Sequence, residues 1–584
     1  VGRVLREFAV TVSIAVAVSA FVSLTLTPMM ASRFLRHETR HGALYRAAEY
    51  CFQALAGAYR RSLGVALRHR FVTLMVFFAT MGLSAYLYVV IPKGFFPPQD
   101  VGLIVGILEA NQDVSFPEME RLVEQANAII KSDPTVTTFI SVLGAGVAGQ
   151  TGNDARFFIN LKPFNQRNAS AQQVIARLRP RFAQMVGARM FMQAAQDINV
   201  GGIISRTQYQ YTLQDADLAE LYQWAPKVLT ALRRVPMLRD LATDQQMSGL
   251  SATLTIDRDA AARYGITPAA IDNILYDAFG QRQVTQYFTQ TNSYYVILEV
   301  LPRLQQDLAT LNELYVPSST GAPVPLSNLV HIDSQKVAPL SVNHANQMPA
   351  VTLSFNLAQG AAIGDAVQAI EKAVAALHPP ASLSGSFQGT AAAFQSSLAS
   401  EPYLIAAAIV AVYIILGILY ESYILPLTIL STIPSAGVGA LLILLAVHYD
   451  LSVIALIGIL LLIGIVKKNG IMLVDFAITA ERRDGKPPLE AIREACLLRF
   501  RPILMTTMAA IFTGLPLMLS HGAGSELRRP LGYTMVGGLA VSQVLTLYTT
   551  PVVYLYLDRL QRWLAPASAR HYPALASKLG ANAD

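Results

Sequence analysis

An apolar run over residues 451–480 with two lysines at its middle most constrains what this chain can fold into. The run exceeds the ~20 apolar residues with which one helix crosses a bilayer. Lys467 and Lys468 would then lie roughly 20 Å along the helix from the start of the run. A charge at that depth usually marks an ion pathway or a buried ion pair, because leaving water is costly. The alternative is two spans that meet at an interface with both lysines snorkelling, but each half would be too short to span.

Composition and charge distribution favour a membrane protein. Mean hydropathy is +0.40 and only 14% of the 584 residues are charged, which is too apolar for an ordinary soluble protein. The net charge of +7 comes from arginines in 33–70, in 482–501 and after residue 558. Each cluster lies beside an apolar span, as cytoplasmic loops do, so we expect membrane lipids and no nucleic acid as neighbours. Cys51 and Cys496 both lie in these basic segments, which excludes a disulfide framework and fits a reducing compartment.

About seven apolar stretches are long enough to be transmembrane helices. They cover 8–30, 71–91, 403–421, 425–447, 452–479, 503–520 and 533–557. The basic segments satisfy one topology in which the long polar block 92–401 lies on the far side of the membrane.

The first span resembles the last one. Residues 17–28 and 540–551 are identical at six of twelve positions without a gap. Chance similarity between apolar helices is the alternative to a true repeat. If the repeat is real, the first span closes an earlier copy, and the chain is a fragment or a half of a longer protein.

The polar block alternates strand-like and helix-like patterns. The first unit is predicted to contain strand 102–110, helix 116–131, strands 135–143 and 156–162, helix 170–185 and strand 188–195. The second is predicted to contain strand 207–213, helix 217–234, strands 238–244 and 349–356, helix 363–377 and strand 382–388. Each is a βαββαβ unit of the split-βαβ, ferredoxin-like type. The insertion has strand 252–256, helix 266–278 and strand 294–300, and its length favours a docking module. The glycine-rich stretch Gly144, Gly146, Gly149 and Gly152 predicts a mobile loop.

The polar residues near the two lysines suggest how the fifth span is used. Lys467 and Lys468 are about 100° apart around a helix, so they cannot share a face. Asn469 can hydrogen-bond to a neighbouring helix. Asp475 lies on the stripe of Lys468, but about 10 Å away along the axis, too far for a direct pair. The other spans hold almost no acidic residue in their middles, so the partner of Lys468 must come from helices outside this chain or from another chain.

The sixth span carries a second candidate group. Arg499 and Thr506 are seven residues apart on one stripe, and a threonine hydroxyl can relay or orient a proton. The alternative is that Arg499 and Arg501 anchor the cytoplasmic interface while Thr506 bonds to its own helix backbone.

Enzyme signatures are missing from the sequence. We find no nucleophile elbow, no Walker lysine loop and no metal-binding histidine pair. Met190 and Met192 alternate on a predicted strand and are expected in its core rather than on a metal. We therefore expect a transporter that is not an enzyme, holds no metal or cofactor, and draws on an ion gradient.

Several motifs resemble one family. They are residues 464–476 and 499–507 in the predicted membrane helices, residues 416–422 at the end of another, and residues 91–100 and 278–283 in the polar block. The chain resembles the resistance-nodulation-division (RND) family of proton-driven exporters, specifically the C-terminal half of its hydrophobe/amphiphile efflux branch. The resemblance covers essentially all 584 residues. It is closest to MdtB/MdtC-type subunits, and more to the MdtC type.

The resemblance implies a trimeric pump of the Gram-negative inner membrane with a large periplasmic part. Adaptor protein and outer-membrane channel would be its partners, and the trimer would contain one or two kinds of RND subunit. The implied segments are helix six (1–30), a cytoplasmic-face amphipathic segment (31–70), helix seven (71–91), two porter subdomains (92–204; 205–249 with 341–400), a docking subdomain (250–340), helices eight to twelve (401–560) and a cytoplasmic tail (561–584).

The resemblance also implies roles for particular residues. Lys468 and Thr506 match the proton-relay positions, with Arg499 and Asn469 as further candidates. The family's acidic pair lies on a fourth helix that this chain does not contain.

In the polar block, Tyr209, Gln210 and Tyr211 match a strand that lines the drug pocket of relatives. Residues 144–154 match their switch loop, but lack its aromatic residues.

The sequence therefore predicts the C-terminal half of a multidrug pump subunit that exports small amphiphilic compounds in exchange for protons and confers antibiotic resistance. Two alternatives stay open. One is a proton-silent subunit that shapes assembly or substrate binding in a hetero-oligomeric pump. The other is a metal or lipid exporter of the same superfamily.

Overall fold

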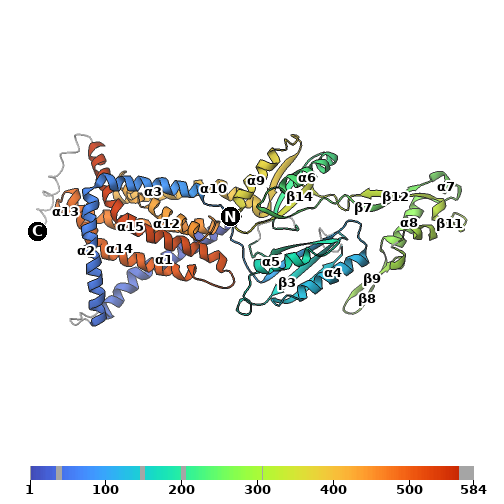
Figure 1. Cartoon of the computed structure of the whole chain (residues 1–584), viewed down its shortest axis with the longest axis horizontal. Helices are drawn as coiled ribbons and strands as arrows, with labels where there is room; N and C mark the ends of the chain where they lie inside the picture. Colours follow the sequence, from blue (N-terminus) through green and yellow to red (C-terminus); the bar gives the residue numbers. More distant parts are fainter. Residues whose placement is uncertain (1, 35–41, 145–150, 199–204, 306, 565–584) are drawn as a thin grey trace.

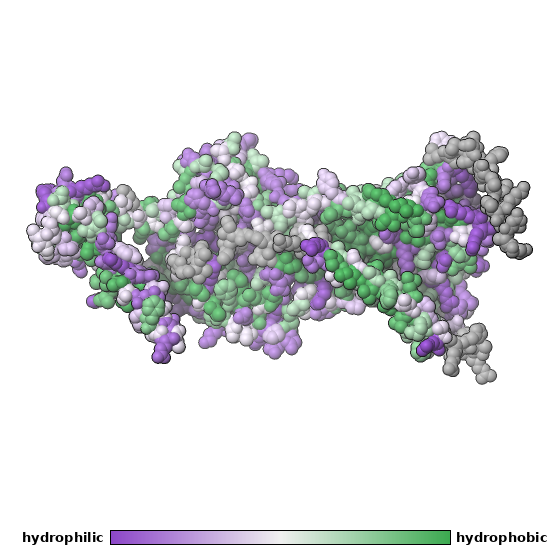
Figure 2. Space-filling view, turned by 180° about the vertical axis from the view of Figure 1, so that it is seen from behind, coloured by the Kyte–Doolittle hydropathy of each residue, from purple (hydrophilic) through white to green (hydrophobic). Residues whose placement is uncertain are grey.

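The computed structural model describes residues 2–34, 42–144, 151–198, 205–305 and 307–564, which form an elongated molecule. Long helices make one end, two α/β units lie in the middle, and a small module stands at the other end (Figure 1). Hydrophobic side chains cover much of the helical end, whereas hydrophilic ones gather on the α/β units and at the outer tip of the helices (Figure 2).

Seven helical segments within the described residues are long and apolar enough to cross a membrane. They are α1 (Gly2–Phe34), α3 (Arg70–Val90), α10 (Gly389–Tyr420), α11 with α12 (Leu425–Leu430 and Ile433–Ala446), α13 (Val453–Asp484), α14 (Pro488–Met518) and α15 (Ser525–Leu564). Some helices extend well beyond their apolar runs. Helix α10 begins at Gly389 rather than near 403, because its Ala-rich start has good helix propensity but little hydrophobicity. The length of an apolar run therefore predicts the part of a helix that can cross a membrane, but not where the whole helix begins and ends.

Helices α12, α13 and α15 form the inside of the bundle, and small residues let them approach closely. A Cβ atom added to Gly439 of α12 would lie 2.4 Å from the carbonyl oxygen of Gly537 in α15. The hydroxyl of Ser435 donates to that of Ser542 across the same contact, at 3.2 Å. In lipid there is no hydrophobic driving force between helices, so helix association is stabilised by close van der Waals packing and by hydrogen bonds between helices.

Helix α2 (Ala43–Arg68) lies across the outer end of the bundle (Figure 1). Its buried face includes Tyr59, whose ring stacks on Phe500 of α14 with centroids 4.5 Å apart. The hydroxyl of Tyr59 donates to the carbonyl oxygen of Leu547 in α15, at 2.9 Å. Arg501 of α14 pairs with Glu49 of α2 at 3.1 Å, so an ion pair also joins these two helices.

The first α/β unit, unit 1 (residues 99–198), has a four-stranded antiparallel sheet of order β2-β3-β1-β4. Its elements are β1 (Leu103–Ala110), α4 (Phe116–Lys131), β2 (Val136–Leu143), β3 (Asp154–Leu161), α5 (Ala171–Phe182) and β4 (Ala188–Ala194). Alternate residues of β1, such as Ile104 and Leu108, pack under the helices. The intervening residues, such as Glu109, face away from them, which follows from the two-residue period of a strand.

The second unit, unit 2 (residues 205–248 and 341–388), has its sheet in the order β13-β14-β5-β15, with β6 also paired to β14. Its elements are β5 (Tyr209–Gln214), α6 (Leu218–Leu232), β6 (Leu238–Thr243), β13 (His344–Ala345), β14 (Met348–Leu357), α9 (Ile363–Ala375) and β15 (Ser384–Gln388). Its core also contains Phe95, Val453 and Ile457, so unit 2 is packed on the start of α13.

The insertion leaves unit 2 along a two-stranded antiparallel ribbon of β7 (Gly249–Ile256) and β12 (Val330–Ala338), and it ends in a distal module (Figure 1). That module contains α7 (Arg258–Arg263), α8 (Pro268–Phe279), β8 (Arg282–Phe288), β9 (Ser293–Leu298), β10 (Tyr315–Pro317) and β11 (Pro323–Pro325). Strand β8 was not predicted, because it pairs only with β9 and all but two of its residues are exposed, so no face of it carries an apolar period. The module has a core of its own around Ile271 and Leu326.

A buried ion pair closes the base of unit 1. Asp100 and Arg167 face each other in a bidentate contact, with side chains 8% and 1% exposed and the shorter oxygen–nitrogen distance 2.7 Å. Burial by itself raises the pKa of Asp100, but hydrogen bonds from Arg167, from the Ala171 amide and from the Gly102 amide outweigh it and lower the pKa.

We predict that Asp100→Ala destabilises unit 1 by about 3–5 kcal/mol, because it leaves the Arg167 charge buried without a partner. Pulse proteolysis in urea of the purified protein, scored by cleavage within unit 1, measures this loss. Since the pKa of Asp100 is lowered, the contribution is present at neutral pH and disappears as the pH falls through that pKa.

The matched control is Glu118→Ala, which breaks an exposed pair with Arg121 on α4. That change should cost less than about 1 kcal/mol. Equal losses for the two variants would contradict the role given to the buried pair.

Candidate functional site

The predicted relay residue Lys468 lies on an outward face of α13. Its side chain is exposed, as are Gly464 and Asp475 on the same stripe, whereas Lys467 is half-buried on another face. Within the part of the chain that the structure describes, Lys468 makes no hydrogen bond or ion pair. An ammonium group in the middle of a spanning helix is therefore presented to whatever covers this face.

Behind Lys468, the next residue points inward and joins three helices. The side-chain amide of Asn469 in α13 donates to the hydroxyl of Thr507 in α14 at 3.1 Å and to the amide oxygen of Gln543 in α15 at 3.5 Å. All three side chains are buried. Asn469 thus bonds to neighbouring helices as the sequence suggested. Thr507 and Gln543 were missed, although their polarity inside apolar spans was a signal.

Among the described residues, no hydrogen bond or ion pair joins Thr506 or Arg499 to Lys468. The hydroxyl of Thr506 donates to the carbonyl oxygen of Ile503 in its own helix at 3.1 Å, as the alternative reading proposed. Arg499 is half-buried with its guanidinium over the ring of Phe476, at 4.8 Å from the ring centre, and its Nε atom has no hydrogen-bond partner. The relay role of these residues stays a prediction.

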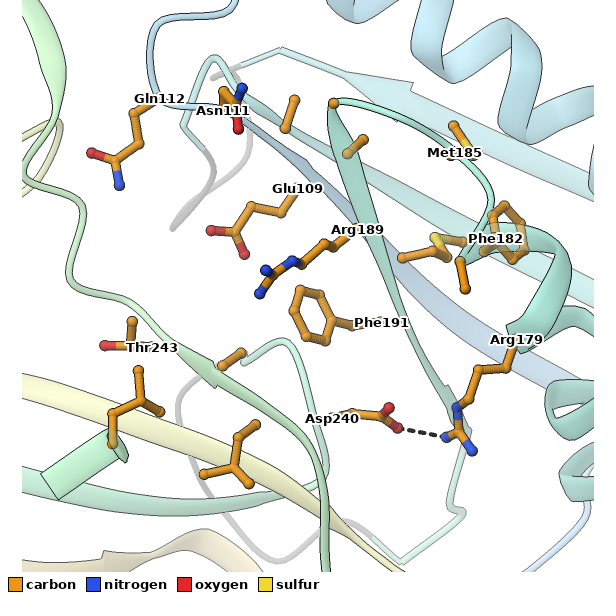
Figure 3. Close-up of a pocket in the computed structure, with 18 of the residues that line it drawn as sticks. Glu109, Asn111, Gln112, Arg179, Phe182, Met185, Arg189, Phe191, Asp240 and Thr243 are labelled. Carbon is orange, nitrogen blue, oxygen red and sulfur yellow. Dashed lines mark hydrogen bonds and ion pairs between the residues drawn. The ribbon is translucent and has the colours of Figure 1, made fainter. Parts of the chain in front are cut away.

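A cavity of about 900 Å³, cavity 1, lies in the cleft between the two units (Figure 3). Its walls come from the end of β1, from α5 and β4 of unit 1, and from β6 of unit 2. Glu109, Arg189 and Phe191 project into it from the sheet face that the helices leave open (Figure 3). An aromatic ring beside charged groups of both signs suits molecules that are partly apolar and partly polar.

A second cavity of about 730 Å³, cavity 2, lies in the same cleft on the side of the helical bundle. It is lined by Phe95 and Phe96, by Tyr209, by Met192 and by amide side chains, and Asp450 borders it from the loop between α12 and α13.

The three residues predicted to line a substrate pocket have different positions in the structure. Both tyrosines belong to the buried core of unit 2, but Tyr209 also lines cavity 2, whereas Tyr211 packs against Phe387. Gln210 lies on the opposite face of β5 and donates to the hydroxyl of Ser205 at 2.9 Å.

The glycines of the predicted switch loop are only partly placed. Gly146 and Gly149 lie outside the described residues, and Gly144 and Gly152 flank that gap. Next to it, the hydroxyl of Thr151 donates to the side-chain oxygen of Gln246 in unit 2, at 3.4 Å.

Arg206, in the connection between the units, forms an ion-pair cluster that the sequence did not predict. Its Nε atom lies 2.5 Å from Glu109 of β1, and a terminal nitrogen lies 3.6 Å from Asp154 of β3. Burial raises the pKa of both carboxyl groups, and the charge of Arg206 only partly offsets it. These residues are far apart in sequence, so no local pattern could pair them.

The segment 92–95, which leaves α3, is held between the bundle and unit 2. The amides of Leu451 and Val453 donate to the carbonyl oxygens of Pro92 and Phe95, at 2.8 and 3.0 Å. On the other side, the amide of Gly364 at the start of α9 donates to the carbonyl oxygen of Lys93 at 3.0 Å. Backbone hydrogen bonds thereby link the start of α13 to unit 2 through this segment.

Asp450 lies against this segment. A Cβ atom at Gly94 would come 2.8 Å from the Cβ atom of Asp450, so only glycine fits there. Burial raises the pKa of Asp450 from 3.8 to about 6, and the nearby carboxylate of Asp365 adds to the rise.

We predict that Asp450→Asn makes the protein more resistant to heat at pH 7.5. The raised pKa means that ionised Asp450 destabilises the folded state, a penalty that is absent below about pH 4 and complete above about pH 6. The difference in melting temperature between variant and parent should therefore shrink towards zero at pH 4. Glu120→Gln, at an exposed carboxylate on α4, is the control. A gap that does not change with pH would contradict the assignment.

Comparison with known proteins places this geometry in a family. The profile of the AcrB/AcrD/AcrF family matches residues 1–558. Two crystal forms of a heavy metal efflux pump have the same fold, with 22% sequence identity over 87% of this chain and TM-scores of 0.78 and 0.77. The matched parts are 53% and 52% of those chains, so this chain spans about half the length of the solved structures. The chain therefore belongs to the AcrB/AcrD/AcrF family, whose members are RND efflux transporters and not enzymes.

Proposed function

We propose that this chain is the C-terminal half of a proton-driven RND pump subunit that exports small amphiphilic compounds. The observation that carries the proposal is the exposed Lys468 in the middle of α13, without a partner in the described residues. An ammonium group at that depth needs a counter-charge. A carboxylate from a helix outside this chain, protonated and deprotonated in turn, would supply it and would make the pair a proton switch.

The contacts of α13 support coupling between such a switch and the cleft. When the opposing carboxylate takes up a proton, its attraction for Lys468 weakens and α13 is free to shift. Asn469 ties α13 to α14 and α15, so the three helices would move together. The start of α13 is part of the core of unit 2 through Val453 and Ile457. A shift of α13 would therefore move unit 2 against unit 1.

The cleft between the units supports an amphiphilic substrate. Cavities 1 and 2 offer about 900 and 730 Å³, the size of sites for drug-like molecules. Phe191 and Tyr209 supply apolar surface, and charged and amide side chains supply polar contacts.

We assign the finer architecture on the same basis. The strand orders of units 1 and 2 support two ferredoxin-like porter subdomains, and the insertion on its ribbon supports a docking subdomain. The proposal further includes seven membrane spans and a place in the Gram-negative inner membrane. The pump would be a trimer of one or two subunit types closest to MdtB/MdtC-type proteins, working with an adaptor and an outer-membrane channel. These assignments rest on membership of the family and on the sequence resemblance.

Metal export is a second candidate, because the solved structures of similar fold are of a heavy metal efflux pump. Thioethers bind soft monovalent metals, and Met190 and Met192 border the two cavities. Both side chains, however, pack in the core of unit 1. Susceptibility to silver and copper salts, compared with susceptibility to amphiphilic drugs, decides between the two substrates.

A proton-silent subunit is the remaining alternative, favoured by the bond of Thr506 to its own helix. Substituting the lysine separately in each subunit type of a mixed pump tests it.

We predict that Lys468→Ala in the intact transporter abolishes efflux while the amount of protein in the membrane is unchanged, because an exposed residue carries no packing within this chain. Lys467→Ala is the matched control: it removes the same charge one residue away, from another face, and should retain most of the transport. Drug susceptibility and membrane protein level are measured together. Full resistance with Lys468→Ala would refute the relay role.

We also predict different outcomes for two aromatic residues. Phe191→Ala, in cavity 1, should change the relative susceptibilities to different amphiphiles at a normal protein level. Tyr211→Ala, in the core of unit 2, should lower the protein level and all resistance together, with a stability loss of about 3–5 kcal/mol. A selective effect of Tyr211→Ala without loss of protein would show that it contacts substrate.

A further inference from the structure

One side chain separates the two cavities of the cleft. Among the described residues that line them, Arg179 of α5 is the one common to cavity 1 and cavity 2. Arg179 therefore lies where the two compartments adjoin. The contacts that hold the side chain of Arg179 are therefore relevant to whether a molecule could pass between the two cavities.

The group that holds it comes from the other unit. A terminal nitrogen of Arg179 lies 2.6 Å from a carboxylate oxygen of Asp240 in β6, as the dashed line in Figure 3 marks. The side chains are 48% and 21% exposed, so water reaches the pair from the cavities. An exposed pair of this kind contributes little to folding stability. It can accordingly open without unfolding either unit.

The backbone at Asp240 is unusual. Its φ of 49° is in the left-handed region, which non-glycine residues rarely adopt. The pairing of β6 with β14 shifts register at this point, between Ser354 and Asn356. Strain of this kind persists only where surrounding contacts enforce it, and it is concentrated at switching sites.

Asn356 supplies those contacts. Its side-chain amide donates to the carboxylate of Asp240 at 3.0 Å and to the carbonyl oxygen of Met192 in unit 1 at 3.3 Å. Arg179, Asp240 and Asn356 thus form one polar bridge between the units. A separate bridge, Arg206 with Glu109, joins the units through β1, and its arginine side chain is 12% exposed against 48% for Arg179. The bridge through Arg179 is the one whose arginine borders both cavities, whereas Glu109 borders cavity 1 alone.

We propose that the Arg179–Asp240–Asn356 bridge is a gate between the two cavities, closed in this conformation, which a substrate must open to pass from one to the other. The inference rests on the proposed function, because it treats the cleft as the substrate path. Movement of unit 2 against unit 1 separates Asp240 from Arg179 and relieves the strained backbone of β6. The gate divides the path into a compartment beside the membrane helices and one beyond it.

Reversible cross-linking tests the gate. The variant Arg179→Cys with Asp240→Cys, combined with Cys51→Ser to remove the exposed native thiol, is treated with a short reducible bis-methanethiosulfonate. Efflux of ethidium by the intact transporter should fall at least about fivefold after cross-linking and recover after reduction, since the linker holds the units as the ion pair does. Efflux that persists in the cross-linked protein would contradict the gate proposal, because it would show that the ion pair only holds the two units together and need not open during transport.

Glu118→Cys with Arg121→Cys is the matched control, since it replaces an exposed ion pair within the single helix α4. Its cross-linking should leave efflux unchanged. If the cysteine pair at the gate does not transport even before cross-linking, charge exchange decides. Arg179→Asp and Asp240→Arg should each impair efflux, and the double variant should restore it. The gate proposal would be refuted if the single variants left efflux unchanged, or if the double variant exported no more ethidium than the single variants.

The rate of cross-linking gives a readout that does not depend on transport. Saturating ethidium should slow the reaction between the two cysteines about fivefold by separating them. A rate unaffected by ethidium, with normal efflux by the unmodified protein, overturns the gate and leaves the proposed function standing. A rate that ethidium does change, in a protein that exports no amphiphile, supports the gate and refutes the proposed function.

Discussion

The proposed transport mechanism depends on one electrostatic constraint, the ammonium group of Lys468 at the middle of the long apolar helix α13. In hydrocarbon a charge needs a counter-charge, water or an escape to the interface. Here the group is exposed on α13 and meets no partner within the described ranges. The opposite face of the helix is fixed by the amide of Asn469, which bonds to two neighbouring helices. The face of α13 that carries Asn469 is thus fixed inside the bundle, and the face that carries Lys468 is open to a partner of opposite charge.

That constraint reaches the α/β units because α13 is not confined to the bundle. Its first turns lie in the core of unit 2, and the backbone just before it is hydrogen-bonded to the segment that leaves α3. The helix is therefore joined to unit 2 by packed side chains and backbone hydrogen bonds, contacts that deform little. Unit 1 is attached to unit 2 through polar bridges, which exchange partners more easily than a packed core. This contrast makes the cleft the place where the molecule can change shape.

Much of the fold was predictable because it is local. Apolar length located the spans, and the two-residue and 3.6-residue periods located most strands and helices of both units to within a few residues. The prediction failed where a period was missing or an apolar run was only part of a helix. Strand β8 is almost entirely exposed, and α10 starts in an Ala-rich stretch of low hydrophobicity. Of the proposed site residues, Asn469 makes the predicted kind of bond and Tyr209 lines a cavity, but Tyr211 lies in the core.

By itself the sequence determined that this chain has helices long and apolar enough to cross a membrane, that a lysine lies in the middle of one of them, and that the second of two similar α/β units is interrupted by an inserted module. Each of these follows from composition or periodicity along one stretch of chain. Only the tertiary structure decided which polar groups meet: Asn469 with Gln543, Arg206 with Glu109, and Arg179 with Asp240. These partners are brought together by how whole elements pack, and the free energy of that packing is spread over many apolar contacts that no single stretch of sequence contains.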